Sequence, residues 1–174
     1  PKREVKRIKQ YLDRLTGAEE QSGAWLQKYS RPYRFVQEQG AEVAAYITGG
    51  VNDAEIKARL ALIVATEEPI SRNFLKVRLL ETYGIRKSGA RVEARLNALI
   101  DECKFRRERV MGADYYYKTD RALQIGKFRV ESEPVLRDET DTTPFEMVSL
   151  IKAALSERVS LYFDELTALA AEVL

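Results

Sequence analysis

Histidine is absent from the 174 residues, and cysteine occurs only once. Without histidine the chain cannot form a Ser-His-Asp triad, an HExxH zinc site or a zinc finger. Cys103 cannot make an internal disulfide, and its neighbours Leu99, Ile100 and Phe105 indicate a small buried side chain. These absences argue against an enzyme.

Long apolar runs are also lacking, since none reaches the roughly 20 residues that span a bilayer. No signal peptide is recognisable, and because the first residue is Pro1 we expect further residues upstream. Gly49 and Gly50 lack the Lys and the Ser or Thr that a phosphate loop needs. We therefore expect a cytoplasmic protein that contacts no membrane and uses no cofactor, metal or small-molecule substrate.

Acidic residues adjacent in sequence are the nearest approach to an acid–base site. They are Glu67 with Glu68, Asp101 with Glu102, and Asp138 with Glu139 and Asp141. Each group lies where we expect solvent, which favours ordinary surface charge over general acid–base catalysis. We predict no catalytic residue.

Charge is distributed unevenly, although the net charge is only +2. Residues 1–40 hold 9 basic and 5 acidic residues, residues 41–130 hold 17 and 12, and residues 131–174 hold 3 and 10. A basic body with an acidic tail suggests a surface for a polyanion, and a segment that avoids this surface or packs against it.

Residues 1–40 are predicted to form an amphipathic helix followed by an aromatic linker. The helix covers residues 3–15, with Val5, Ile8, Leu12 and Leu15 on its apolar stripe. The linker carries Trp25, Tyr29, Tyr33 and Phe35. We favour rings that fix the linker to the body over rings that stack on bases.

Residues 41–130 are predicted to form a winged-helix domain within an α+β, mostly helical chain. Helices are expected at 54–66, capped by Asn52 or Asp53, at 72–83, capped by Ser71, and at 90–102. Their predicted inward residues are, in chain order, Ile56, Leu60, Ile63, Val64, Leu75, Leu79, Leu80, Tyr83, Val92, Leu96, Leu99 and Ile100. Glu68 and Pro69 end the first helix, Ile70 adds a short extended segment, and Gly84 suits a left-handed C-terminal position. The last two helices form a helix-turn-helix.

A β-hairpin is expected directly after the third helix. Two extended runs, 105–110 and 115–119, flank a four-residue loop at 111–114 that contains Gly112. Alternation places Tyr116 on one face and Tyr115 and Tyr117 on the other. Three helices and this hairpin complete the winged helix.

Residues 131–174 are predicted to form an acidic linker and a C-terminal helix pair. Thr143, Pro144, Phe145 and Glu146 read as a capping box with proline at the first helical position. The first helix should end near Glu157, and the second covers 164–174 without a glycine cap. We expect the fold to continue beyond the last residue.

The third helix and the hairpin carry the candidate site. Helical geometry turns Arg91, Ala94 and Ala98 outward, and small alanines allow close approach to a groove. A basic residue recurs at every fourth position, at Lys87, Arg91 and Arg95. These residues form one positively charged edge that is able to contact phosphates or the edge of a guanine base. The predicted nucleic-acid-binding residues are Lys87, Ser88, Arg91, Arg95, Arg106, Arg107, Arg109, Tyr116 and Lys118. An ordinary solvated helix face, or cross-strand pairs of Tyr and Arg, would give the same patterns.

The residues of this region resemble those of an uncharacterised domain family at the C-terminal end of large bacterial proteins related to superfamily-one helicases. The resemblance covers about residues 56–174. It rests on the segments 67–70 (EEPI), 79–80 (LL), 83–92 (YGIRKSGARV) and 143–146 (TPFE). Residues 1–15 also resemble the closing helix of an endonuclease-like domain that precedes this module.

The resemblance implies that the ATPase motor and any nuclease site lie upstream, so this chain inherits no catalytic residue from the family. The chain departs from the family at Ser71, where histidine is expected, and at residues 115–117, where phenylalanine and tryptophan are commoner.

We expect an accessory module that binds nucleic acid, above all duplex DNA, next to the upstream domains of the parent protein. The alternative is a protein-docking or interdomain module of the same parent, because winged helices serve both purposes. The acidic tail and the unpartnered apolar faces of the first and last helices favour this alternative.

Overall fold

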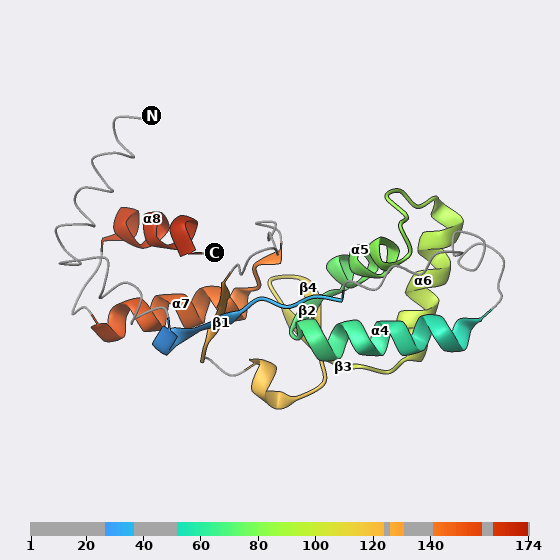
Figure 1. The fold of residues 1–174 in the computed structure, drawn as a ribbon, viewed down its shortest axis with the longest axis horizontal. Coiled ribbons are helices and arrows are strands. Elements are labelled where there is room, and N and C mark those ends of the chain that lie inside the picture. Colours follow the sequence, from blue (N-terminus) through green and yellow to red (C-terminus); the bar gives the residue numbers. More distant parts are fainter. Residues whose placement is uncertain (1–26, 37–51, 124–125, 131–140, 158–161, 174) are drawn as a thin grey trace. The chain divides into compact units, whose positions relative to one another are not determined.

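The computed structural model describes residues 27–36, 52–123, 126–130, 141–157 and 162–173 (Figure 1). These residues form an α+β, mostly helical chain with two small sheets. The chain divides into a central unit, Arg34–Gln124, and a terminal unit, Pro1–Tyr33 with Ile125–Leu174. Within the described residues no helix combines the length and apolarity that crossing a bilayer requires.

The described residues of the central unit include the helices α4 (Asp53–Glu67), α5 (Arg72–Thr82) and α6 (Ala90–Glu102). The Asn52 side chain accepts a hydrogen bond from the Glu55 N–H at 3.3 Å, and the Ser71 hydroxyl accepts one from the Phe74 N–H at 3.2 Å. Gly84 follows α5 at φ 68°. These observations confirm the predicted caps and the left-handed glycine, and each helix begins and ends within one residue of its predicted bounds.

The core of the central unit consists of the apolar stripes of the three helices and two side chains from the sheet, Ile70 and Tyr116. Its buried members are Ile56, Leu60, Ile63, Val64, Ile70, Leu75, Leu79, Leu80, Tyr83, Leu96, Leu99, Ile100 and Tyr116. The predicted inward residues are therefore confirmed, with Val92 and Cys103 partly buried at the edge. Burial raises the pKa of the Cys103 thiol, which fits a structural side chain.

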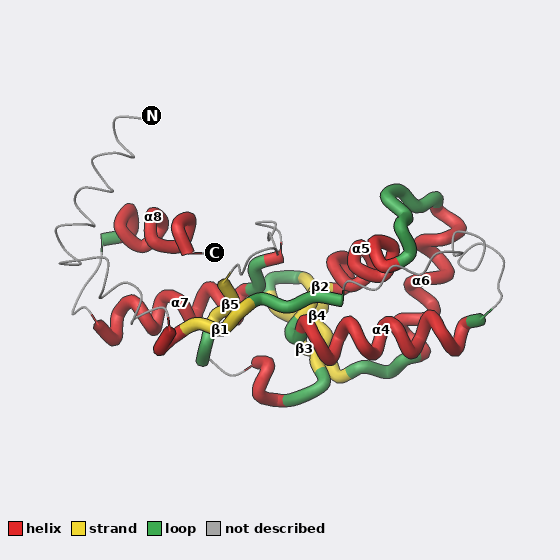
Figure 2. Tube along the Cα trace, viewed as in Figure 1, coloured by secondary structure: helices red, strands yellow, loops and turns green. Residues whose placement is uncertain are grey.

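A three-stranded sheet covers the ends of these helices, with the strand order β2-β4-β3 (Figure 2). Strand β2 (Ile70–Ser71) pairs antiparallel with β4 (Ala113–Tyr117), and β3 (Arg106–Val110) pairs antiparallel with β4 on the other side. A short 3-10 helix, η1 (Asp120–Leu123), follows.

The predicted four-residue hairpin loop is wrong. Val110 pairs with Ala113, which leaves Met111 and Gly112 as the whole loop. Their φ values of 50° and 82° are both positive, as in the tight turns that match the twist of two strands. Residues 113 and 114, which we assigned to the loop, instead continue the ladder.

Glu68 joins the loop after α4 to the end of the hairpin. Its carboxylate accepts hydrogen bonds from the N–H groups of Lys118 and Thr119, at 2.5 and 2.8 Å, and from the Thr119 hydroxyl at 2.8 Å. The neighbouring Glu67 is only 1% exposed and pairs with Arg78, with Nε and Oε2 3.0 Å apart. The expectation that these two acids are solvated is thus wrong for Glu67, whose counter-ion comes from the next helix.

The terminal unit contains β1 (Ser30–Pro32) and β5 (Phe128–Val130), which pair in parallel, and the helices α7 (Pro144–Glu157) and α8 (Phe163–Val173). Phe128, Leu150 and Ala153 form its core. Strand β5 lies within the stretch 41–130 that we predicted as one domain, but it belongs here because its backbone partner is β1.

The capping box at the start of α7 is confirmed. Glu146 Oε2 accepts from the Thr143 N–H at 2.9 Å, and Thr143 Oγ1 accepts from the Glu146 N–H at 3.4 Å. The same carboxylate holds Arg129 of β5, with Nε and Oε1 2.6 Å apart. Asp141, expected in solvent, is 5% exposed and accepts from the Tyr33 hydroxyl at 3.3 Å, so that expectation is wrong.

Tyr33 is 1% exposed, which is the behaviour expected of a ring that fixes the linker to the body. The predicted helix at 3–15, Trp25 and most of the acidic linker lie outside the described residues.

Candidate nucleic-acid interface

Helix α6 is held on both flanks by ion pairs to its neighbouring helices. On the α4 flank Arg95 bonds to Asp53, and Lys57 Nζ lies 2.5 Å from Glu102 Oε2. On the α5 flank Lys76 Nζ lies 2.7 Å from Glu93 Oε2. The described part of the chain leaves a narrow stripe of α6 uncovered between these flanks. Its exposed residues are Ala90, Arg91, Ala94 and Ala98, and the exposed acids Asp101 and Glu102 follow at the C-terminal end of the helix.

Arg72 fixes α6 and the hairpin relative to α5. Its Nη1 and Nη2 donate to the two carboxylate oxygens of Asp101 at 2.7 and 3.0 Å. Nη1 also lies 2.8 Å from the Tyr116 hydroxyl, and Nη2 donates to the Asn97 carbonyl at 3.0 Å. One planar guanidinium therefore ties three elements together. No signal in the sequence singled out Arg72, because its partners lie 25, 29 and 44 residues away.

The hydrogen bonds from Arg72 hold the pKa of Asp101 below its ordinary value of 3.8, and those from Lys76 and Ser88 lower the pKa of Glu93 from 4.5. A carboxyl whose pKa is depressed in the folded state stabilises the fold above its unfolded pKa. This contribution is lost as the pH falls through the folded pKa. Both groups should therefore make the fold less stable in acid.

We expect the Asp101→Asn variant to lose less stability than wild type on acidification below pH 4. Asparagine cannot take up the proton that breaks the pair with Arg72, so the part of the acid sensitivity that belongs to this carboxyl disappears. Urea denaturation at neutral pH and at about pH 3 measures the difference. Equal acid sensitivity of the two proteins would contradict a depressed pKa at Asp101.

Three predicted site residues are occupied by contacts inside the central unit. Arg95 pairs with Asp53 of α4. The Ser88 hydroxyl donates a hydrogen bond to the Glu93 carboxylate. Arg106 Nη1 lies 3.0 Å from Asp120 Oδ1. The period of the helix placed Arg95 on a charged edge but could not show that this edge faces the beginning of α4.

The prediction that Tyr116 contacts nucleic acid is wrong. Its ring is 2% exposed and packs edge-on against Phe105, with the ring centroids 5.9 Å apart. The alternation of the three tyrosines is as predicted, but Tyr116 stands opposite Ile70 of β2, on the face that closes the core. Its hydroxyl remains satisfied because it reaches Arg72.

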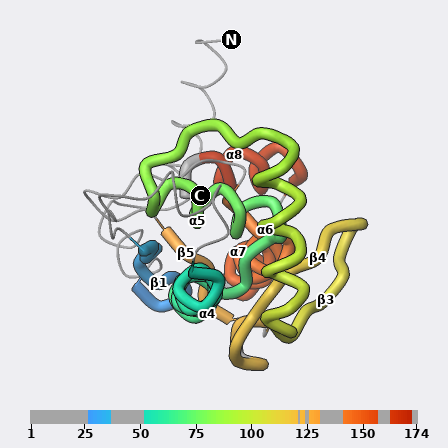
Figure 3. The backbone as a smooth tube through the Cα atoms, turned by 90° about the vertical axis from the view of Figure 1, so that its right-hand side faces the viewer, coloured from blue at the N-terminus to red at the C-terminus, as the bar shows by residue number. Residues whose placement is uncertain are grey.

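The hairpin presents two arginines on the side of α6. Arg107 is paired across the strands with Tyr116 and Arg109 with Asp114, so both share the face of Tyr116, whereas Arg106 lies on the opposite face. Their side chains are 61% and 71% exposed and contact Asp114 only at 3.8 and 3.7 Å. Figure 3 shows α6 and this hairpin following one another along one side of the central unit.

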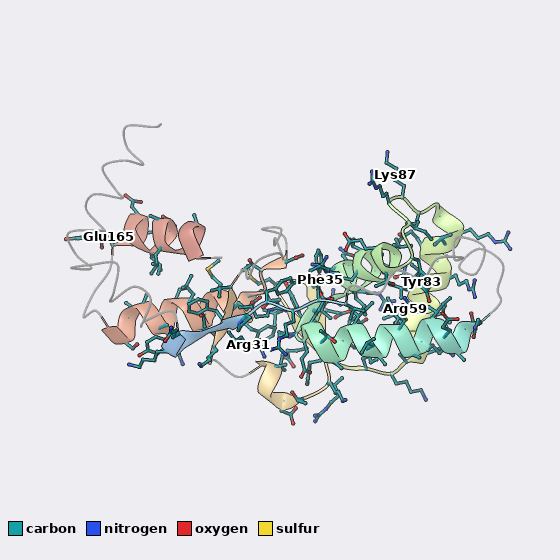
Figure 4. All side chains as sticks on the ribbon, viewed as in Figure 1. Arg31, Phe35, Arg59, Tyr83, Lys87 and Glu165 are labelled. Atoms are coloured by element: carbon teal, nitrogen blue, oxygen red, sulfur yellow. The ribbon has the colours of Figure 1, made fainter. Side chains whose placement is uncertain are left out.

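Several cations of the central unit have no side-chain ion pair with any described residue. Lys87 extends from the loop between α5 and α6, away from the helices (Figure 4). The exposed cations of this kind are Arg86, Lys87, Arg91, Lys104 and Lys118. Arg86 and Lys104 were not among the predicted site residues, although Arg86 is adjacent to the predicted Lys87 and Lys104 lies two residues before the predicted Arg106.

The whole chain was compared with protein-family models, curated proteins and solved structures. Neither a protein-family model, nor a curated protein, nor a solved structure is significantly similar to this chain. Within the described residues no group of three or more acidic or cysteine side chains could hold a metal ion.

Proposed function

We propose that the central unit is a winged-helix module that binds duplex DNA through α6 and the β3–β4 hairpin, in a larger helicase-related protein. The order of its elements supports the winged helix: α4, β2, α5, α6, β3 and β4 follow one another, and the short β2 pairs with β4. In this arrangement α5 and α6 form a helix-turn-helix whose second helix enters the major groove.

The charge balance of the uncovered face carries the proposal. Two acidic side chains of α6 form ion pairs with α5, Glu93 with Lys76 and Asp101 with Arg72. Arg86, Lys87 and Arg91 make no such pairs with the described residues. The internal ion pairs thus remove the negative charge that would repel phosphates and leave a positive excess around the small side chains Ala94 and Ala98.

A docking function is the second candidate, and an observation in the terminal unit favours it. Large apolar side chains are exposed on α7 and at the start of α8. They are Met147, Val148, Leu155, Tyr162 and Phe163, with Tyr162 and Phe163 79% and 77% exposed. Exposed apolar side chains of this size are typical of protein interfaces. This unit could therefore join the module to the parent protein while the central unit binds DNA.

Binding to duplex DNA should weaken steeply with salt. If three to five cations meet phosphates, the association constant falls with a log–log slope of roughly −3 to −5. Arg91→Ala and Arg107→Ala each remove one exposed cation from separate elements, and each should reduce the magnitude of the slope by about one. Fluorescence anisotropy at several salt concentrations measures the slopes.

Arg106→Ala serves as the matched control, because Arg106 is adjacent to Arg107 in sequence but lies on the opposite face of the hairpin and pairs with Asp120. Its slope should equal that of wild type. If wild type shows no salt-sensitive binding to duplex, single-stranded or forked DNA at about 50 mM salt, the proposal fails and docking replaces it.

A further inference from the structure

The tip of the β3–β4 hairpin presents a single large apolar side chain to solvent. Met111 is 91% exposed, more than any other large hydrophobic residue that the structure describes. Its backbone is left-handed at φ 50°, where a side chain is unfavourable and Asn or Gly is the usual choice. Neither packing nor turn geometry therefore accounts for methionine at this position.

The tip is held in shape by its own strand. Arg109 Nη2 donates to the carbonyl of Gly112, the residue that follows Met111 in the turn, at 3.2 Å. Arg107 and Arg109 lie on one face of the hairpin behind the tip, and both are more than half exposed. The apolar side chain thus projects from a stiff turn with two cations behind it.

We propose that Met111 is an apolar wedge that enters a base step of the bound duplex from the minor groove. This inference rests on the proposed function, because it assigns a role to the tip of the same interface. With α6 in the major groove, the hairpin that follows it reaches the neighbouring groove. Apolar side chains, methionine among them, partly unstack a base step there and bend the duplex.

The chemistry of the tip fits this ligand better than a protein groove. Arg107 and Arg109 would lie beside the phosphates that line the groove, while the unbranched thioether adapts to the irregular gap between two bases. A protein that covered the same tip would need acidic groups around an apolar pocket.

The experiment uses the full 174-residue chain and short duplexes that each carry 2-aminopurine at a different position. Wild type at saturation should raise the fluorescence at one step, because unstacking removes the quenching by neighbouring bases. Met111→Asn removes the thioether but creates Asn-Gly, the preferred sequence for this turn, so the hairpin is retained. This variant should give no rise, and its affinity should fall by about tenfold or less, since unstacking offsets part of the burial.

The salt slope of Met111→Asn should stay that of wild type, because no phosphate contact is lost. Met147→Ala is the matched control, since Met147 is the other methionine of the chain and lies on α7. It should behave as wild type. Peroxide gives a second readout: bound duplex should slow sulfoxide formation at Met111 and leave the rate at Met147 unchanged.

The outcomes separate this inference from the proposed function. Salt-sensitive binding with no rise in fluorescence, or with a rise that Met111→Asn retains, overturns the wedge and leaves DNA binding intact. Absence of salt-sensitive binding overturns both. Protection of Met111 by a protein and not by duplex would assign the tip to docking.

Discussion

Replacing Glu146 with glutamine should lower the free energy of unfolding of the terminal unit by about 3–5 kcal/mol. Arg129 and Glu146 are 5% and 4% exposed, and they form a two-pronged ion pair with distances of 2.6 and 2.7 Å. The Arg129 guanidinium also lies over the Tyr33 ring, 5.2 Å from its centroid. Glutamine has the shape of glutamate and can still cap α7, but it removes the negative charge that Glu146 places beside the buried guanidinium.

Hydrogen exchange at the amides of residues 128–130 measures this loss in the terminal unit alone. Arg129→Met, which instead removes the positive charge beside the Glu146 carboxylate, should be similarly destabilising. The double variant Glu146→Gln with Arg129→Met should cost clearly less than the sum of the two, because neither side chain of the pair is then a charge that has lost its opposite number. Additive costs would show that the two side chains stabilise the unit independently of their pairing.

Replacing Leu96 with alanine should destabilise the central unit by about 2–5 kcal/mol. Leu96 is fully buried at the centre of the face of α6 that meets the other helices. Removing most of its side chain loses apolar burial and leaves a cavity that the surrounding helices fill only in part. Urea denaturation of the variant and of wild type measures the difference.

Ala94→Ser is the control on the same helix, because Ala94 lies on the uncovered stripe. A surface substitution of this kind should change stability by no more than about 0.5 kcal/mol. Equal losses in the two variants would contradict the orientation of α6, and with it the assignment of Arg91, Ala94 and Ala98 to the DNA-facing side.

The helices were predictable because their signals are local. Asn52, Ser71 and Thr143 each cap a helix through a backbone N–H three residues away, so composition over a few positions is sufficient. The apolar period then fixes which face turns inward, and Leu96 and Ile100 are buried as predicted.

The hairpin was only partly predictable, since small and polar residues occur both in loops and in strands. Asp114 was assigned to the loop, but it stands in the ladder opposite Arg109. For Tyr116 the alternation was right and the orientation was not, because alternation distinguishes two faces without saying which one meets the core. The pairing of Tyr116 with Ile70, 46 residues earlier in the chain, determines which face of the hairpin meets the core.

The sequence by itself determined the bounds of the three helices of the central unit, their inward faces and the concentration of positive charge in the middle of the chain. Only the tertiary structure decided which of these arginines and lysines are already held in ion pairs within the chain. Arg95 and Arg91 lie one helical turn apart, yet only Arg95 meets an aspartate from another helix, and Arg72 is occupied by Asp101. Ion pairs between distant elements depend on where the chain brings them together, and a local pattern does not contain this information.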